Sequence, residues 1–251
     1  MKQFIAVLTW LFLAGTGASS TGALAGENRV YTVDGEAYQG YYEPVEDSRG
    51  LVVIIHDWDG LTDYEVKRAG MLADMGYSVF AADLFGQGVR PTELADKRAL
   101  TGALYQDRDR MRRLMQGALA AAASTGADPD SAVVIGYCFG GTAVLELARS
   151  GEDLAGFVSF HGGLETPEGQ DYSQTRGKVM VYHGSADRAV SMQQFADLAN
   201  QLEEQNVPHQ MTTYSGAPHA FTVFGSSRYR EEADRESWES FTDFLGENLG
   251  G

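Results

Sequence analysis

The chain has 251 residues and carries 35 acidic against 19 basic side chains, a formal net charge of −16 at pH 7. Such a surface repels nucleic acid and anionic lipid, so neither is expected as a partner. The chain has one cysteine, which excludes an internal disulfide, and its length is ample for one hydrophobic core without covalent support.

The N-terminal segment has the three parts of a secretory signal peptide. Lys2 supplies a positive charge, residues 4–14 are apolar, and a region of small residues ends at 23–25. We expect cleavage after Ala25 and a mature domain over 26–251 that is exported, either to the periplasm or out of the cell. One alternative is an uncleaved membrane anchor, but the apolar stretch is shorter than the roughly 20 residues that a membrane span requires. The other is a lipoprotein, but no cysteine directly follows the apolar stretch to accept a lipid. No membrane contact is expected after cleavage.

The mature chain alternates between strand and helix patterns. The strands are expected over 133–135, 154–160, 179–182 and 209–214, after antiparallel edge strands within 30–44 and further strands over 51–55 and 77–82. The helices are expected over 64–75, 142–149, 192–205 and 228–248, with two more within 91–124 that break near Gly102. This alternation predicts a mostly parallel sheet with helices on both faces, in a single α/β domain, because no repeat or linker divides it.

The segment GYCFGG places Cys138 between two glycines where a strand passes into a helix. This fits the G-x-nucleophile-x-G turn, with cysteine in place of the commoner serine. Side chains at Gly136 and Gly140 would collide with the neighbouring strand and helix. We expect a strained backbone at Cys138 and a sulfur that faces solvent beside a helix N-terminus, which favours a thiolate. The alternative is a small buried apolar cysteine, the commoner fate of a free thiol.

A thiol nucleophile needs a base, and the base needs an acid that orients it. In hydrolases with this turn the chain order is nucleophile, acid, histidine. Asp187 lies in HGSADRAV directly after a strand, and His219 lies in GAPHAF after the last strand. Taken alone, Asp187 could equally be a turn or N-cap residue, and His219 could equally be a surface histidine. Their placement relative to Cys138, at the carboxyl ends of parallel strands, predicts a catalytic triad.

Two backbone N–H groups are expected to form an oxyanion hole. One belongs to Phe139, directly after the nucleophile, and the other to Trp58 in the loop HDWDG. We assign structural roles to three further histidines, each of which follows a predicted strand: His56, His161 and His183. The fourth, His209, opens an edge strand and is expected to be solvated. No metal and no organic cofactor is expected, because no two histidines have helical ligand spacing and no second cysteine is present.

Six segments, HDWDGLTDY, FAADLFG, GYCFGG, FVSFHGG, HGSADRAV and GAPHAF, together resemble the dienelactone hydrolase family across nearly the whole mature chain. The resemblance implies a compact α/β-hydrolase fold, a triad of Cys138, Asp187 and His219, and an ester or lactone substrate that is attacked to give a thioester. Family members usually carry a glutamate that holds the resting thiol and exchanges a proton with it. Asp57, which is one methylene shorter, stands at that position here.

The resemblance also indicates where a substrate carboxylate would bind. Members that hydrolyse dienelactone grip its carboxylate with two arginines, and the matching positions here look like Gln87 and Val223. Arg90 is close enough in sequence to take the first place, and nothing takes the second. One cation or none would hold a carboxylate poorly in so acidic a protein, so dienelactone itself is not assumed to be the substrate.

The leading hypothesis is an exported, cysteine-dependent hydrolase of a carboxylic ester or lactone, with that small molecule as its partner. The alternative is a non-catalytic small-ligand-binding protein with the same fold, suggested by Asp57 and by the altered arginine positions. A redox thiol protein is disfavoured because the chain has no resolving cysteine. The sequence carries no indication of the oligomeric state.

Overall fold

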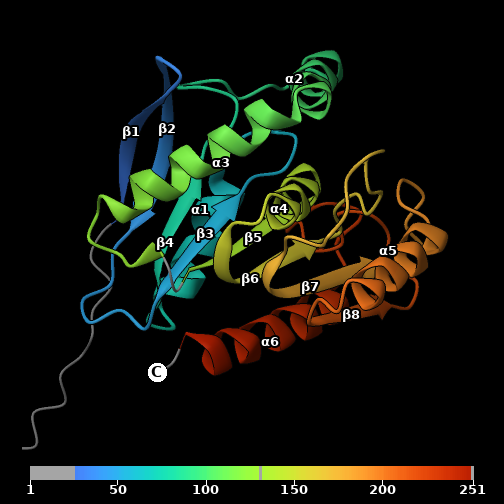
Figure 1. The fold of residues 1–251 in the computed structure, drawn as a ribbon. Helices are drawn as coiled ribbons and strands as arrows, with labels where there is room; N and C mark the ends of the chain where they lie inside the picture. The colour runs from blue at the N-terminus through green and yellow to red at the C-terminus, as the bar shows by residue number, and fades with distance from the viewer. Residues whose placement is uncertain (1–25, 130–131, 250–251) are drawn as a thin grey trace, which may run out of the picture.

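The computed structural model describes residues 26–129 and 132–249, so the predicted signal peptide lies outside the described residues. One eight-stranded sheet runs through this part of the chain, in the order β1-β2-β4-β3-β5-β6-β7-β8 (Figure 1). The strands are β1 (Glu27–Val33), β2 (Glu36–Glu43), β3 (Leu51–Ile55), β4 (Ser78–Ala82), β5 (Val133–Tyr137), β6 (Asp153–Phe160), β7 (Arg176–Gly184) and β8 (His209–Tyr214). Only β1 and β2 run antiparallel to their neighbours, which confirms a mostly parallel sheet with antiparallel strands at one edge.

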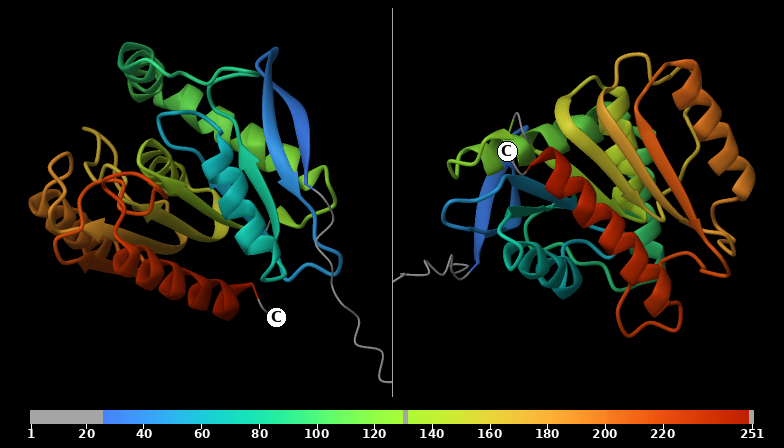
Figure 2. Two further views of the ribbon diagram at one scale, coloured as in Figure 1. Left: turned by 180° about the vertical axis from the view of Figure 1, so that it is seen from behind. Right: turned by 90° about the horizontal axis from the view of Figure 1, so that it is seen from below.

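Helices cover both faces of the sheet, as predicted (Figure 2). They are α1 (Asp63–Ala73), α2 (Leu94–Gln106), α3 (Arg108–Ala123), α4 (Phe139–Arg149), α5 (Met192–Glu204) and α6 (Glu231–Asn248). One hydrophobic core lies between the sheet and α3, α4 and α5, and a second lies between the sheet and α1 and α6. Every residue of β3 and β5 is buried, which explains why the central strands read as unbroken apolar runs. No helix in the described ranges is both long and apolar enough to span a membrane.

Two predicted helix boundaries are wrong. Gly102 lies inside α2, and the chain turns instead at Asp107, whose carboxylate caps α3 by accepting a 2.9 Å hydrogen bond from the N–H of Arg110. A glycine is tolerated inside a helix at a modest cost, whereas an aspartate at the N-cap position begins a new one. The closing helix begins at Glu231, so that Arg228 and Arg230 belong to the loop before it.

The strand register brings the functional loops to one edge of the sheet. Ile55 of β3 is paired with Ala82 of β4 and with Gly136 of β5, so the loops after these three strands leave side by side. Gly184 of β7 is paired with Tyr214 of β8, which aligns the loops that carry the predicted acid and base. The carboxyl ends of parallel strands are where this class of sheet binds ligands.

Candidate active site

The turn between β5 and α4 has the strained geometry that its sequence predicts. Cys138 has φ 52° and ψ −110°, values that non-glycine residues rarely adopt. A Cβ atom on Gly136 would lie 2.2 Å from the carbonyl oxygen of Gly140, and one on Gly140 would lie 2.3 Å from the carbonyl oxygen of Ile55. Because neither backbone oxygen can move without breaking the turn, both positions require glycine. The sulfur is thereby raised above the sheet edge at the N-terminus of α4.

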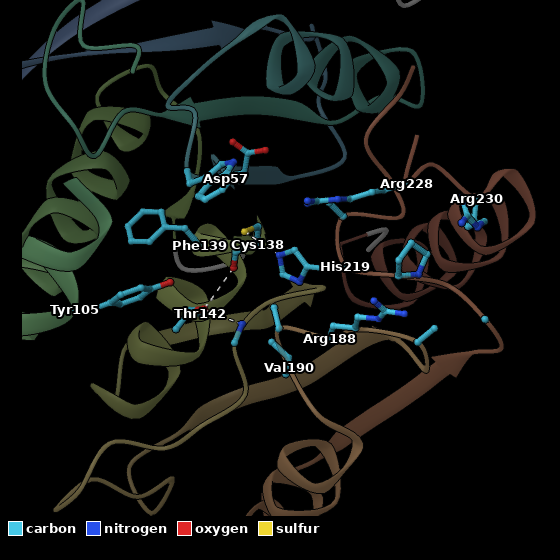
Figure 3. Close-up of a pocket in the computed structure, with 17 residues that line it drawn as sticks. Asp57, Tyr105, Cys138, Phe139, Thr142, Arg188, Val190, His219, Arg228 and Arg230 are labelled. Atoms are coloured by element: carbon cyan, nitrogen blue, oxygen red, sulfur yellow. Dashed lines mark hydrogen bonds between the residues drawn. The ribbon is translucent and has the colours of Figure 1, made fainter. Parts of the chain in front are cut away.

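The structure brings Cys138, His219 and Asp187 together although they follow three different strands. Figure 3 shows Cys138 and His219 side by side. The Nε2 atom of His219 lies 3.1 Å from the sulfur of Cys138, and its Nδ1 atom lies 2.8 Å from Oδ2 of Asp187. The other carboxylate oxygen of Asp187 accepts hydrogen bonds from the N–H groups of Ala189, at 2.7 Å, and Val190, at 3.0 Å. The carboxylate is therefore fixed from both sides and holds the imidazole in a single orientation.

The pKa values of the acid and the base are set by their contacts. Burial alone would raise the pKa of Asp187, but hydrogen bonds from His219 and from two backbone N–H groups outweigh it and lower that pKa. Burial alone would lower the pKa of His219, but its hydrogen bonds to Asp187 and Cys138 outweigh it and raise that pKa to about 10. The imidazole therefore carries a proton at neutral pH, placed between a carboxylate and a sulfur.

Asp57 lies in the wall of the same cavity, directly after the end of β3. Burial raises the pKa of Asp57 to about 6, although a 2.7 Å hydrogen bond from the N–H of Asp59 opposes the shift. Glu65 of α1 is fully buried behind it, and burial followed by the charge of Asp57 raises the pKa of Glu65 to about 8. Asp57 thus shares the cavity wall with the thiol, and a second carboxyl group that resists ionisation, Glu65, interacts with Asp57 from the buried side.

The two expected oxyanion donors also belong to this wall. Trp58 and Phe139 both line the cavity beside Cys138. Phe139 is the first residue of α4, so its N–H is among those that have no acceptor within the helix. An oxygen atom that develops charge at this point would also meet the positive end of the helix dipole.

The cavity has a volume of about 720 Å³ and two chemically different sides. Tyr105 and Phe139 lie on one side of the thiol and imidazole, and Arg188 and Arg228 lie on the other, beyond His219 (Figure 3). Arg230 completes the cationic side, and all three arginines are exposed at the cavity rim. We call Arg188, Arg228 and Arg230 the rim arginines.

The rim arginines correct the expectation that one cation or none would be available. Among the described residues that line the cavity, neither Gln87 nor Arg90 occurs. Gln87 bonds to the side chain of Gln39 at 3.4 Å, and Arg90 lies 3.6 Å from the buried carboxylate of Asp83. Arg188 adjoins the predicted acid and could have been found from the sequence. The sequence does not point to Arg228 and Arg230, because its helical pattern predicts a closing helix from 228 and so includes both residues in that helix, which begins at Glu231.

The remaining histidines lie at strand ends, as their positions predict, but His209 is not the solvated residue expected, since its side chain is only 14% exposed. His56 accepts a 3.1 Å hydrogen bond from the N–H of Leu84 and contacts the carbonyl oxygen of Asp57 at 2.6 Å, so it joins the loops after β3 and β4. Burial lowers the pKa of His56 to about 4. His183 is buried against the ring of Phe195, and His209 lies on edge strand β8. The described residues contain no group of three or more His, Cys, Asp or Glu side chains that could hold a metal ion.

A comparison with known proteins shows which family the chain belongs to. A model of the dienelactone hydrolase family matches residues 39–249. The chain belongs to the dienelactone hydrolase family. The resemblance drawn from the six sequence segments is thereby confirmed, as is the single-domain α/β-hydrolase fold, and the protein is a hydrolase.

Several relatives cover most of the chain. The crystal structure of a promiscuous, dienelactone hydrolase-like phosphotriesterase from metagenomic libraries is 30% identical, has a TM-score of 0.83, and is matched over 90% of this chain and 99% of its own. A structure called m3DLH is 33% identical with the same TM-score and the same coverage. A Salmonella typhimurium protein named "Putative carboxymethylenebutenolidase" is 20% identical over 86% of this chain and 85% of its own length.

Proposed function

We propose that this protein hydrolyses a carboxylic ester or lactone through Cys138, His219 and Asp187, by way of a thioester. The observation that carries the proposal is the continuous contact from sulfur to imidazole to carboxylate, with distances of 3.1 Å and 2.8 Å. It lies in the wall of a cavity large enough for a small molecule. The family match and the name of the Salmonella relative support the same class of reaction.

The reaction divides into two halves. The sulfur of Cys138 attacks the carbonyl carbon, and the N–H groups of Trp58 and Phe139 hold the oxyanion. As the tetrahedral intermediate collapses, His219 gives its proton to the departing alkoxide, and an acyl thioester remains. His219 then removes a proton from water, whose oxygen attacks the thioester carbonyl. Collapse of the second intermediate releases the carboxylic acid and restores the thiolate beside the imidazolium, so that one water is consumed for each ester bond.

The two sides of the cavity suggest how the substrate lies. Because His219 must protonate the departing oxygen, the alcohol part of the substrate has to lie on the side of His219, where Arg188 and Arg228 are found. The acyl part of the substrate then lies on the aromatic side of the cavity, against Tyr105 and Phe139. Guanidinium groups bind carboxylates strongly. We therefore propose that the protein also accepts substrates whose alcohol part carries an acid group.

The test is an activity screen of the mature protein, residues 26–251, on short p-nitrophenyl esters, neutral lactones and acid-bearing lactones. Cys138→Ala should abolish turnover, and His219→Ala should be nearly as damaging. Cys138→Ser should fold but lose most activity, because an alcohol is a far weaker acid than a thiol. Mass spectrometry of the protein during turnover should find the acyl group on Cys138. Turnover by Cys138→Ala at the parent rate would refute the proposal, and stabilisation by a ligand that is never hydrolysed would favour the binding alternative.

We also propose that the protein is exported and processed after Ala25, on the evidence of the charged, apolar and small-residue parts of its first 25 residues. Expression of the full chain in a bacterial host, followed by cell fractionation and N-terminal sequencing, tests this. The exported protein should begin at Gly26. Recovery of the uncut chain from the cytoplasm would refute it.

A further inference from the structure

We infer that His161 is a positioning residue, which locks the turn that carries Cys138 to the loop that carries His219. The inference rests on the proposed function. His161 follows β6 and is fully buried, with its backbone held at φ 41°. Its Nδ1 atom accepts a second hydrogen bond, at 3.2 Å, from the N–H of Cys138, which also donates to the carbonyl oxygen of Phe160 at 3.0 Å. Its Nε2 atom lies 2.8 Å from the hydroxyl of Thr222. Thr222 lies three residues after His219 in the same loop.

These contacts fix the direction of every hydrogen bond around His161. The N–H of Cys138 can only donate, so Nδ1 must accept, and the ring proton lies on Nε2 and is donated to Thr222. The hydroxyl of Thr222 is left to donate to the phenol oxygen of Tyr64, 2.7 Å away. A charged His161 would place a second N–H against that of Cys138. Burial and the nearby charge of His219 hold the pKa of His161 well below its ordinary range, so the ring stays neutral.

The far end of this network is anchored on α1 and α6, the two helices that cover one face of the sheet. Arg68 of α1 donates to the phenol oxygen of Tyr64 at 3.3 Å and to the carbonyl oxygen of Thr222 at 3.0 Å. Its guanidinium is buried and paired with the carboxylate of Asp234 on α6. Removing one partner of a buried pair leaves an uncompensated charge, so the anchor resists displacement. Thr222 is thus held through both its side chain and its backbone.

The arrangement explains how two distant loops stay in register. Cys138 follows β5 and His219 follows β8, and β6 and β7 lie between these strands in the sheet. His161, at the end of β6, connects the loop after β5 to the loop after β8, close to the contact between the sulfur of Cys138 and the imidazole of His219. The 3.1 Å contact between Cys138 and His219 depends on both loops being held. A misplacement of about 1 Å in a catalytic group costs roughly 100-fold in rate.

The test compares Thr222→Val, which keeps the shape but removes the hydroxyl, with Thr222→Ser, which keeps the hydroxyl. We expect Thr222→Val to lower kcat by roughly 10- to 100-fold with little change in KM, because the aligned geometry and not the substrate site is lost. Thr222→Ser should restore most of that loss. Tyr64→Phe should give a smaller loss, and Tyr182→Phe, a matched buried tyrosine bonded to Ser240 at 3.1 Å, should give none.

A second measurement does not depend on turnover. The rate constant for alkylation of Cys138 by iodoacetamide is measured at pH 7, because the 3.1 Å contact with His219 activates the sulfur. Thr222→Val and Tyr64→Phe should lower this rate constant, and Tyr182→Phe should leave it unchanged. If Thr222→Val does not fold, Tyr64→Phe and His161→Asn, which keeps an acceptor for the N–H of Cys138, decide the question.

The outcomes separate this inference from the proposed function. Unchanged kcat and an unchanged alkylation rate in Thr222→Val and Tyr64→Phe would overturn the positioning role even if Cys138 is the nucleophile. Equal damage in Thr222→Val and Thr222→Ser would also overturn it, because packing and not the hydroxyl would then be responsible. If the parent protein hydrolyses no ester, the proposed function fails, and the alkylation rate still tests whether the network holds Cys138 against His219.

Discussion

Replacing Asp57 with asparagine should make the protein more stable at neutral pH and less active. Burial raises the pKa of Asp57 from 3.8 to about 6. At about 1.4 kcal/mol for each pKa unit, ionising this carboxyl in the folded protein costs roughly 3 kcal/mol. Because the folded pKa is the higher one, the stability is fully present below pH 3.8 and is lost as the pH rises to about 6. Asparagine has nearly the same shape and never ionises.

Thermal unfolding of the parent and of Asp57→Asn between pH 3.5 and pH 8 measures this effect. The two proteins should be equally stable near pH 3.5, and the variant should gain steadily up to about pH 6 and then hold a constant advantage. For a domain of this size, roughly 3 kcal/mol corresponds to a rise in Tm of about 6–12 °C. Asp63→Asn, an exposed carboxylate in the first turn of α1, serves as the control and should lose a few tenths of a kcal/mol.

The activity of Asp57→Asn should change in the opposite direction. If Asp57 exchanges a proton with the thiol, the kcat/KM profile of the parent has an inflection near pH 6 that the variant lacks, and the variant is slower above it. A gain in Tm that is independent of pH would refute the assignment of the raised pKa to Asp57. An unchanged kcat/KM profile would show that Asp57 takes no part in the reaction. Its ionisation would still lower the stability of the folded protein.

Three further predictions concern other parts of the site. Asp187→Asn should lower kcat/KM by roughly 10³- to 10⁴-fold, because an amide can neither stabilise the imidazolium nor fix its tautomer, and a loss below ten-fold in steady-state rates would contradict this. Arg228→Ala should raise KM for acid-bearing esters by about ten-fold or more and leave neutral esters unchanged, so an equal effect on both would count against a carboxylate contact. Gly136→Ala should abolish activity and lower Tm because its Cβ would strike the carbonyl oxygen of Gly140, whereas Gly102→Ala, with nothing within 4 Å, should gain up to about 1 kcal/mol in thermal unfolding.

Features that depend on local sterics could be predicted from the sequence. The glycines around Cys138 predict a tight turn regardless of how the adjoining strand and helix pack in the fold. The strained φ of Cys138 follows from that turn. The burial of β3 and β5 follows from their composition alone. The position of the break between α2 and α3 does not follow from glycine, which is tolerated inside α2 at residue 102, but from Asp107, which offers a capping oxygen.

Features that depend on how loops meet could not be predicted. The sequence shows that His161 follows a strand, but its contact with the N–H of Cys138 arises from the pairing of β5 with β6 and from the path of the loop after β8. Nothing in the residues beside His161 indicates that Thr222, 61 positions later, accepts a hydrogen bond from its ring. A buried histidine of this kind reads as a structural residue until its partners are known.

The rim arginines show why sequence distance from a catalytic residue is a poor guide to the charge of a pocket. Val223, four positions after His219, is absent from the described cavity wall, whereas Arg228 and Arg230 belong to it. The loop turns back on itself there, since the N–H of Arg230 donates to the carbonyl oxygen of Phe221 at 2.9 Å. That bond returns a later part of the chain to the neighbourhood of His219. In this chain the ends of parallel strands place Cys138, Asp187 and His219, whereas the closure of the loop after His219 places Arg228 and Arg230.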